Sequence, residues 1–342
     1  MRIGLIGCGD VADFGHAPAI LSTVGWELAG VYDPDQARMH AFAAKHGGIP
    51  THTSCESLLE SDLRAVTICS PPAAHADNAL RAAEHGLAIL CEKPISPTEA
   101  EAVAMTSAIQ ALGVPFYIGF VYRFSPVAIQ IRRWIREGVI GEVRSLRLLY
   151  LWDLHGQWMP DGNGEWIESP RWRGRMLEGG PMVDCGVHQI DLARWWLGSE
   201  VVRTTAAGAW VSEYEAPDHV YVHLDHENGA HTMVEMSFTY GHTAARPRSQ
   251  FVYELIGTGG VIRFDRDGYV LEILNGSGVF RGEGASEKNF AGMYAEFHRA
   301  VETGDPGMMP SASDGIMATR IAREATDAVI AGRHTRGLVS LP

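Results

Sequence analysis

The chain has 342 residues with a formal net charge of -13 at pH 7, and 46% of them are hydrophobic. This length predicts two domains, and the composition is that of a folded globular protein. The acidic balance argues against nucleic acid and anionic membranes as partners, because both are bound by clustered Lys and Arg. No apolar stretch of the sequence is long enough to cross a bilayer.

Five cysteines are spread along the chain without a C-x-x-C pair. An odd count without paired spacing predicts a reducing compartment rather than a disulfide framework. The first residues pass directly into a strand-like run and a glycine turn, so no secretory signal peptide is expected. The sequence therefore predicts a cytoplasmic protein.

Short apolar runs alternate with helical patterns through the first third of the chain. The strand-like runs cover residues 2–7, 27–33, 65–70, 87–93 and 115–120. The helical patterns cover residues 12–23, 35–46, 74–85 and 97–112. Runs that are apolar throughout are typical of parallel strands covered on both faces. Strict alternation of strand and helix predicts an α/β, doubly wound Rossmann domain over residues 1–121.

The pattern changes after residue 121. A helix is predicted over 125–141, and further helices near 186–197, 290–302 and 313–331. Long strand-like runs cover residues 142–153, 203–214, 219–228, 231–240 and 249–265. Short Asn-Gly and Gly-Gly turns between such runs predict an open, mostly antiparallel sheet. Residues 122–342 are therefore predicted to form an α+β domain, whose last helix can pack back on the first domain. The Trp-rich stretch 152–176 lacks periodicity and predicts an ordered, functional loop.

A glycine turn follows the first predicted strand. Gly7, Gly9 and Ala12 form a G-x-G-x-x-A motif that opens a helix. Gly7 allows a tight turn, and Gly9 lets the backbone approach a pyrophosphate. The helix N-terminus, where Asp10 and Val11 lie, supplies N–H groups to the same anion. Alone, this motif is a weak indication of a dinucleotide site.

Asp33 strengthens it, because an acid at the end of the second strand can bind both ribose hydroxyls of adenosine. The same carboxylate repels the extra phosphate of NADP, so NAD is the predicted cofactor. Arg38, one helical turn later, leaves NADP open. The alternative role of Asp33 is to cap the helix that starts at Pro34.

Two further strand ends carry polar residues to the carboxyl edge of the predicted sheet, where ligands of such sheets lie. Ser70, Pro71 and His75 follow one strand and are candidates for the nicotinamide side. His75 could equally be a surface histidine at a helix start. Glu92 and Lys93 end the next strand, immediately before Pro94, which restricts the backbone. Glu92 either tunes the charge of Lys93 at the cofactor edge or caps the following turn.

Asp184 and His188 are four residues apart and share one face of a helix that starts near Met182. Asp191 lies on nearly the same face. Three alternatives remain for this group: a buried structural network, a metal site, or an acid–base relay, for which histidine is the usual group near neutral pH. Beside a dinucleotide domain the relay is preferred. A metal site would need a third ligand, and the spacing offers none, so no metal is predicted.

In this order the motifs resemble the Gfo/Idh/MocA oxidoreductases. The resemblance is based on GCGDVA (7–12), CSPPAAH (69–75), CEKP (91–94), GFVYRFSP (119–126) and EGGPMVDCGVHQIDLARWWLG (178–198). It implies a Rossmann domain followed by a domain with an open sheet, used for substrate binding and oligomerisation. It also implies hydride transfer between NAD(P) and a CH–OH group of a sugar, cyclitol or related polyol. Homodimers or homotetramers formed through the sheet faces are the implied assemblies.

The resemblance also implies roles for single residues. Lys93 corresponds to the catalytic lysine of the E-K-P motif and would stabilise negative charge on the substrate oxygen. His188 would take the hydroxyl proton, and Asp184 would bind a neighbouring hydroxyl and orient His188. The Lys93–Pro94 bond is often cis in relatives. Tyr122 in place of asparagine, and GGP in place of three glycines, leave the substrate open.

Further substrate candidates carry aromatic rings, which stack on sugars, or groups that bind hydroxyls. They are Tyr122, Arg123, Trp152, His155, Trp172 and Arg173. For each tryptophan the alternative is packing within the loop. Two other functions stay open: glycoside cleavage or elimination with transient oxidation of the sugar by bound NAD, and a non-catalytic sensor. A sensor would be expected to lack the lysine, aspartate and histidine that are present here.

Overall fold

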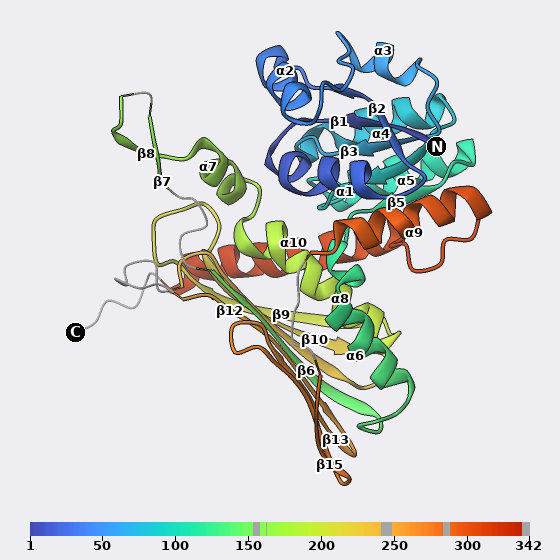
Figure 1. Ribbon diagram of the computed structural model, residues 1–342. Coiled ribbons are helices and arrows are strands. Elements are labelled where there is room, and N and C mark those ends of the chain that lie inside the picture. Colours follow the sequence, from blue (N-terminus) through green and yellow to red (C-terminus); the bar gives the residue numbers. More distant parts are fainter. Residues whose placement is uncertain (153–157, 162, 241–247, 283–287, 337–342) are drawn as a thin grey trace. The chain divides into compact units, whose positions relative to one another are not determined.

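The computed structural model describes residues 1–152, 158–161, 163–240, 248–282 and 288–336 (Figure 1). The chain divides into two compact units. The first consists of Met1–Ser125 and Lys288–Thr319, and the second of Pro126–Glu287 and Arg320–Pro342. The predicted domains 1–121 and 122–342 differ from these units chiefly in residues 288–319, which belong to the first unit. No helix in the described ranges has both the length and the apolar character needed to span a bilayer.

The first unit contains a five-stranded, all-parallel sheet in the order β2-β1-β3-β4-β5. Its strands are β1 (Arg2–Ile6), β2 (Glu27–Tyr32), β3 (Ala65–Ile68), β4 (Ala88–Cys91) and β5 (Phe116–Ile118). Residues of β3 and β4 are buried throughout, as expected for strands covered on both faces. The predicted doubly wound α/β domain is confirmed.

Helices connect the parallel strands. They are α1 (Ala17–Ser22), α2 (Gln36–Lys45), α3 (Cys55–Leu59), α4 (His75–Glu84) and α5 (Glu99–Leu112). The side chains of Asp35 and Thr98 accept backbone N–H groups at the starts of α2 and α5, which is the usual N-cap interaction. Helix α3 was not predicted, because five residues give no helical period; its one local signal is the capping box of Ser54 and Ser57.

The C-terminal region of the chain returns to the first unit through α9 (Phe290–Thr303). Phe297 of α9 stacks on Trp26 with ring centroids 5.4 Å apart, and the Trp26 indole donates to the Tyr294 carbonyl. The connection from α9 to α10 (Ala312–Arg336) then lies along β5, where the Ile118 N–H donates to the Pro310 carbonyl at 2.9 Å. Residues 288–319 therefore complete the core and one edge of the first unit.

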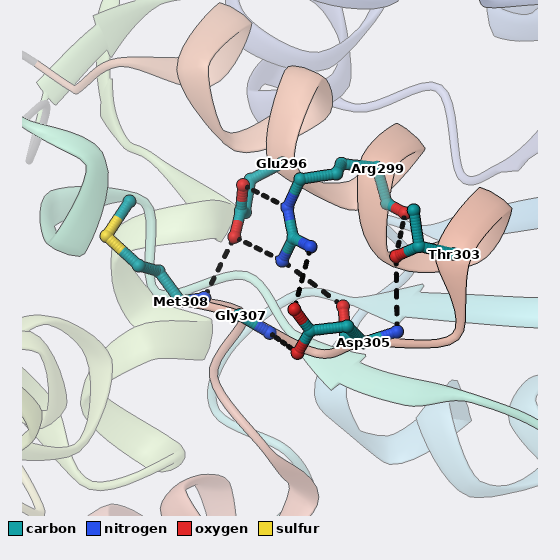
Figure 2. Close-up of polar contacts among 6 residues, drawn as sticks. All are labelled: Glu296, Arg299, Thr303, Asp305, Gly307 and Met308. Atoms are coloured by element: carbon teal, nitrogen blue, oxygen red, sulfur yellow. Dashed lines mark hydrogen bonds and ion pairs between the residues drawn. The ribbon is translucent and has the colours of Figure 1, made fainter.

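A polar network holds the α9–α10 connection in place (Figure 2). The Arg299 guanidinium binds the carboxylates of Glu296 and Asp305. The Glu296 carboxylate also accepts the Met308 N–H at 2.9 Å, and Asp305 accepts the Gly307 N–H at 3.0 Å. One arginine thus links the end of α9 to the segment that pairs with β5.

The second unit contains an eight-stranded sheet in the order β15-β14-β13-β12-β6-β11-β10-β9. Its strands are β6 (Val143–Leu151), β9 (Val201–Ala209), β10 (His219–His226), β11 (His231–Ser237), β12 (Gln250–Gly257), β13 (Gly260–Asp265), β14 (Val270–Asn275) and β15 (Gly278–Arg281). All pairs are antiparallel except β6 with β11, which confirms the open, mostly antiparallel sheet. The predicted run 249–265 is two strands joined at Gly257–Gly260, and β14 and β15 were missed.

Helices cover one face of this sheet, and the other, the open face, carries exposed and half-buried side chains in the described residues. Helix α8 (Val187–Leu197) packs on β6 and β11 and beside α6 (Pro126–Arg136) (Figure 1). Burial alternates along β10 and β12, as expected for strands with one solvated face. That face carries a row of alternating charges across neighbouring strands, made by Arg147, Glu254, Arg263 and Glu272.

The stretch 152–176, predicted to be an irregular loop, contains regular structure. A hairpin of β7 (Trp158–Pro160) and β8 (Trp166–Glu168) precedes α7 (Pro170–Leu177). These elements are too short for a sequence period to reveal them. Ser169 and Pro170 form a typical helix start, which is the local signal that was overlooked.

Candidate active site

The glycine turn lies between β1 and the first helix, where the strand order of the sheet reverses. Gly7 has φ +95°, and a Cβ at this position would lie 2.6 Å from the Ser70 nitrogen. A Cβ on Gly9 would have no atom within 4 Å. Gly7 is therefore required by the protein's own backbone, whereas Gly9 leaves open space. An open space beside a helix N-terminus fits the pyrophosphate of a dinucleotide.

The helix after this turn begins with Asp10 and Val11 and widens into a π-helical segment over Ala12–His16. Such segments are rare in proteins, and those that occur often lie at functional sites. The ring of Phe290 closes over the widened turn, because a Cβ on Gly15 would lie 2.6 Å from it. His16 is the last residue of this segment, and its side chain is fully buried.

Asp33 connects the end of β2 to the glycine turn. Its Oδ2 accepts the Cys8 N–H at 2.8 Å, and its Oδ1 accepts the Asp35 N–H at 2.8 Å. The helix cap proposed as its alternative role is instead made by Asp35, which accepts the Arg38 N–H. The Arg38 guanidinium lies 3.8 Å from the Asp33 carboxylate. Asp33 thus stands beside the open space of the turn, as its predicted ribose contact requires.

His75 joins the loops that follow β3 and β4. Its Nε2 lies 2.8 Å from the Ser70 carbonyl oxygen, and its Nδ1 lies 3.1 Å from the Pro94 carbonyl oxygen. The ring is 1% exposed, and burial lowers the pKa of His75. This is not the surface histidine considered as an alternative. Ser70 and the exposed Pro71 line the same edge, and their cofactor contacts stay predictions.

Glu92 is buried at the end of β4. Its Oε1 accepts from His16 Nε2 at 2.9 Å, and its Oε2 accepts the Lys93 N–H at 3.2 Å. Burial by itself would raise the pKa of Glu92. The hydrogen bond and charge of His16, with the charges of Lys93 and Lys288, bring that pKa below its usual range. Lys93 is half-buried, and its bond to Pro94 is cis.

The residues after β5 are also buried. Arg123 pairs with Asp314 at the start of α10, with Nη2 and Oδ1 3.2 Å apart. Tyr122 is 4% exposed, and Lys288 Nζ lies 5.7 Å from the centre of its ring. The Arg123 guanidinium therefore binds the start of α10. Its contact with the substrate stays a prediction.

Asp184 and His188 lie in the second unit at the start of α8. The predicted helix begins as a π-helical turn over Met182–Gly186 and becomes α-helical at Val187. Asp184 is partly exposed, and its Oδ2 lies 3.2 Å from Nε of Arg175 on α7. His188 is buried in the first α-helical turn, and Asp191 is fully buried. The structure thus brings Arg175, which was not predicted, to the Asp184 carboxylate.

The substrate candidates of the Trp-rich stretch make contacts within the protein, and their substrate contacts stay predictions. Trp172 is 1% exposed and packs against Tyr214 and Phe238, which is the packing alternative. Arg173 makes an ion pair with Glu215. Trp152 is partly buried beside Tyr150, with ring centroids 4.7 Å apart. His155 lies outside the described residues.

Comparisons with known proteins agree with both halves of this architecture. Residues 1–120 match the family model described as an oxidoreductase family with an NAD-binding Rossmann fold, and residues 128–263 match the GFO/IDH/MocA C-terminal domain. The chain belongs to the Gfo/Idh/MocA family. It is therefore an oxidoreductase with an NAD-binding domain, as its motifs indicated.

Several Gfo/Idh/MocA relatives are named dehydrogenases. D-glucoside 3-dehydrogenase of Escherichia coli (strain K12) is 29% identical over 257 residues, which are 70% of this chain and 70% of that protein. Inositol 2-dehydrogenase of Rhizobium meliloti (strain 1021) is 28% identical in an alignment of 349 positions that covers 98% of each chain. An oxidoreductase from Agrobacterium radiobacter, crystallised with NAD+, L-tartaric acid and magnesium, shares the fold with a TM-score of 0.81 at 20% identity, covering 97% of each chain.

Four residues near the candidate positions were missed by sequence reasoning: His16, Arg175, Lys288 and Tyr294. His16 lies in the predicted helix 12–23, of which only the N-terminus was given a role, and Lys288 and Tyr294 belong to a region assigned to the other domain. Of these four residues, Arg175 could have been found from the sequence, because it lies within one helical turn of the predicted candidates Trp172 and Arg173.

Proposed function

We propose that this protein oxidises a secondary hydroxyl of a sugar or cyclitol, with NAD as the hydride acceptor. The observation that carries the proposal is the carboxyl edge of the parallel sheet. There the open turn at Gly9 and the ribose-binding candidate Asp33 accompany Lys93, the lysine of the E-K-P motif. The names of the relatives, glucoside and inositol dehydrogenases, support this substrate class.

The proposed mechanism assigns one task to each side chain. The ammonium of Lys93 donates a hydrogen bond to the substrate oxygen and stabilises the negative charge that develops there. His188 accepts the hydroxyl proton. Asp184, held by Arg175, binds a neighbouring hydroxyl and orients His188. Bound NAD+ supplies the hydride acceptor. In the reverse direction His188 returns the proton to the same oxygen.

The preference for NAD over NADP rests on Asp33. Both of its oxygens already accept backbone N–H groups, so the carboxylate is held in place with its negative charge beside the turn. A second phosphate at the ribose would meet this charge, and Arg38 would offset it only in part because its side chain is 56% exposed.

The test is a panel of inositols, glucosides, free sugars and sugar acids, assayed with NAD+ and with NADP+ for formation of the reduced cofactor. Lys93→Met should lower kcat on the best substrate by about 10²–10⁴-fold, the usual contribution of such a group. Lys45→Met is the control, because that lysine is exposed and pairs with Asp13. Wild-type activity in Lys93→Met, or no binding of NAD+, would refute the proposal.

The same assay separates the alternative of glycoside cleavage with transient oxidation. In that case the substrate is consumed while the reduced cofactor does not accumulate. Assembly into homodimers or homotetramers stays a prediction, and the open sheet face offers a surface for it. Exposed apolar side chains on that sheet include Val202, Ile256, Val279 and Phe280.

A further inference from the structure

The carboxyl group of Glu92, the residue before Lys93, is buried. Glu92 is 6% exposed, and a Cβ on Gly119 would lie 2.8 Å from its Oε1, so the backbone closes around it. A buried carboxylate is costly unless it is paired and hydrogen-bonded. Here the pairing comes from His16, which belongs to the helix after the glycine turn. A neutral side chain at position 92 would avoid that cost, and so the charge calls for a functional explanation.

The contacts of His16 continue into the unit. Its Nδ1 lies 2.7 Å from the Tyr294 hydroxyl, which lies 2.9 Å from the Thr67 hydroxyl. If His16 is neutral and donates to Glu92 from Nε2, Nδ1 accepts from Tyr294. If His16 is protonated, Nδ1 donates to Tyr294, which then donates to Thr67. Because both hydroxyls can donate or accept, the chain satisfies either state of the histidine, and in both states Glu92 keeps a donor.

The network joins three segments that are far apart in the sequence. His16 follows the glycine turn, Glu92 ends β4, and Tyr294 lies in α9. Each of the three side chains is buried. The first two are 76 residues apart in the chain, and His16 and Tyr294 are 278 apart. One hydrogen bond, made by His16, therefore connects the helix after the glycine turn to the carboxylate next to Lys93.

We propose that His16 and Tyr294 are positioning residues that hold Glu92 as an ionised carboxylate behind Lys93, and so keep the lysine charged and its backbone fixed for catalysis. This inference rests on the proposed function, in which Lys93 acts as an ammonium. Glu92 fixes the backbone by accepting the Lys93 N–H. Its negative charge favours the ammonium by direct electrostatic attraction.

The groups that face Glu92 determine how its charge responds to pH. They are His16, Cys69, His75, Cys91, Lys93, Lys288 and Tyr294. Burial raises the pKa values of the Cys69 and Cys91 thiols well above the usual range, and the negative charge of Glu92 is the next largest cause. Both thiols are therefore neutral near neutral pH, and the charges that respond to Glu92 are the cations.

Substitutions at His16 separate the hydrogen bond from the charge. His16→Gln keeps an N–H donor for Glu92 but cannot carry a proton, and His16→Leu removes both. Tyr294→Phe keeps the ring packing and removes the hydroxyl. His46→Gln is the matched control, because His46 Nε2 also bonds a carboxylate at 2.9 Å, that of Asp13, away from β4. Tyr117→Phe controls for loss of a tyrosine hydroxyl in the same unit.

Two measurements test the proposal. The first is kcat against pH with NAD+ and the best panel substrate. The second is competitive trace acetylation of Lys93 with acetic anhydride against pH, read by mass spectrometry, which needs no turnover. In His16→Gln we expect kcat to fall about 10-fold to 100-fold, the size of effect that a small misplacement produces. The Kd for NAD+ should change by less than about threefold.

The pH response gives the decisive result. Without its donors Glu92 is protonated more easily, and a neutral Glu92 no longer favours the Lys93 ammonium. The alkaline limb of kcat and the acetylation curve should therefore both move to lower pH. The shift to lower pH should be larger in His16→Leu than in His16→Gln, which keeps a donor for Glu92. Tyr294→Phe should also show a shift. An unchanged acetylation curve in His16→Leu, or equal shifts in the controls, would overturn the proposal. If no panel substrate is oxidised, the proposed function fails alone, because the acetylation curves still decide the role of His16 and Tyr294.

Discussion

The two glycines of the turn after β1 should respond in opposite ways to the same added methyl group. Gly7→Ala places a Cβ 2.6 Å from the Ser70 nitrogen, at a φ of +95° that side chains rarely adopt. Gly9→Ala places a Cβ where no protein atom lies within 4 Å and where φ is outside the left-handed region. The first substitution therefore acts on folding, and the second acts on whatever fills the open space.

The magnitudes follow from these contacts. A left-handed alanine costs about 1–3 kcal/mol, and the backbone clash adds to it, so Gly7→Ala should lower Tm by several degrees for a unit of this size. Gly9→Ala should change the free energy of unfolding by less than about 0.5 kcal/mol. If the pyrophosphate lies against Gly9, overpacking by one methyl costs about 1–3 kcal/mol, which is about 5-fold to 160-fold in the Kd for NAD+.

Thermal unfolding without cofactor and calorimetric titration with NAD+ measure the two effects separately. The reasoning is refuted if Gly9→Ala binds NAD+ as tightly as the wild type, because the open space would then not be the pyrophosphate site. It is also refuted if Gly9→Ala loses as much stability as Gly7→Ala, since the position would then be packed against the protein.

Two further predictions concern arginines that sequence reasoning did not single out. Arg175→Gln should lower kcat/KM about 10-fold to 160-fold, because the partly exposed Asp184 loses a charged partner and a hydrogen bond to a charged group is worth about 1.5–3 kcal/mol. Arg133→Gln, which breaks an exposed pair with Glu137, is the control, and equal losses in both would contradict a specific role. Arg299→Ala should lower Tm and speed proteolytic cleavage between residues 304 and 311, since it releases Glu296 and Asp305 together (Figure 2). Arg81→Ala, at an exposed pair with Asp77, should do neither; a connection that is cut no faster in Arg299→Ala would show that other contacts hold it.

Local pattern was enough for the first unit's sheet and for the position of its functional edge. The strands around Leu5, Val66 and Leu90 are apolar on both faces, and Gly7 marks the turn after β1. Since parallel strands with helical crossovers have one arrangement of ends, Asp33, Ser70 and Lys93 had to meet at the carboxyl edge. The sequence did not show that Trp172 is buried against Tyr214 and Phe238, because an aromatic residue in an aperiodic stretch gives no sign of whether it faces a ligand or a core.

The family of fold, the glycine turn and the set of residues at strand ends could be predicted from the amino-acid sequence, because these depend on neighbours a few positions apart. Folding in three dimensions places residues 288–319 in the first unit, pairs the buried Glu92 with His16, and brings Arg175 to Asp184. These contacts join segments separated by many intervening residues, and no periodicity records them, since each side chain's local pattern is equally compatible with solvent. A charged side chain needs a partner within the protein only where packing removes the water that would otherwise solvate the charge. The partner can therefore be identified only from the folded structure.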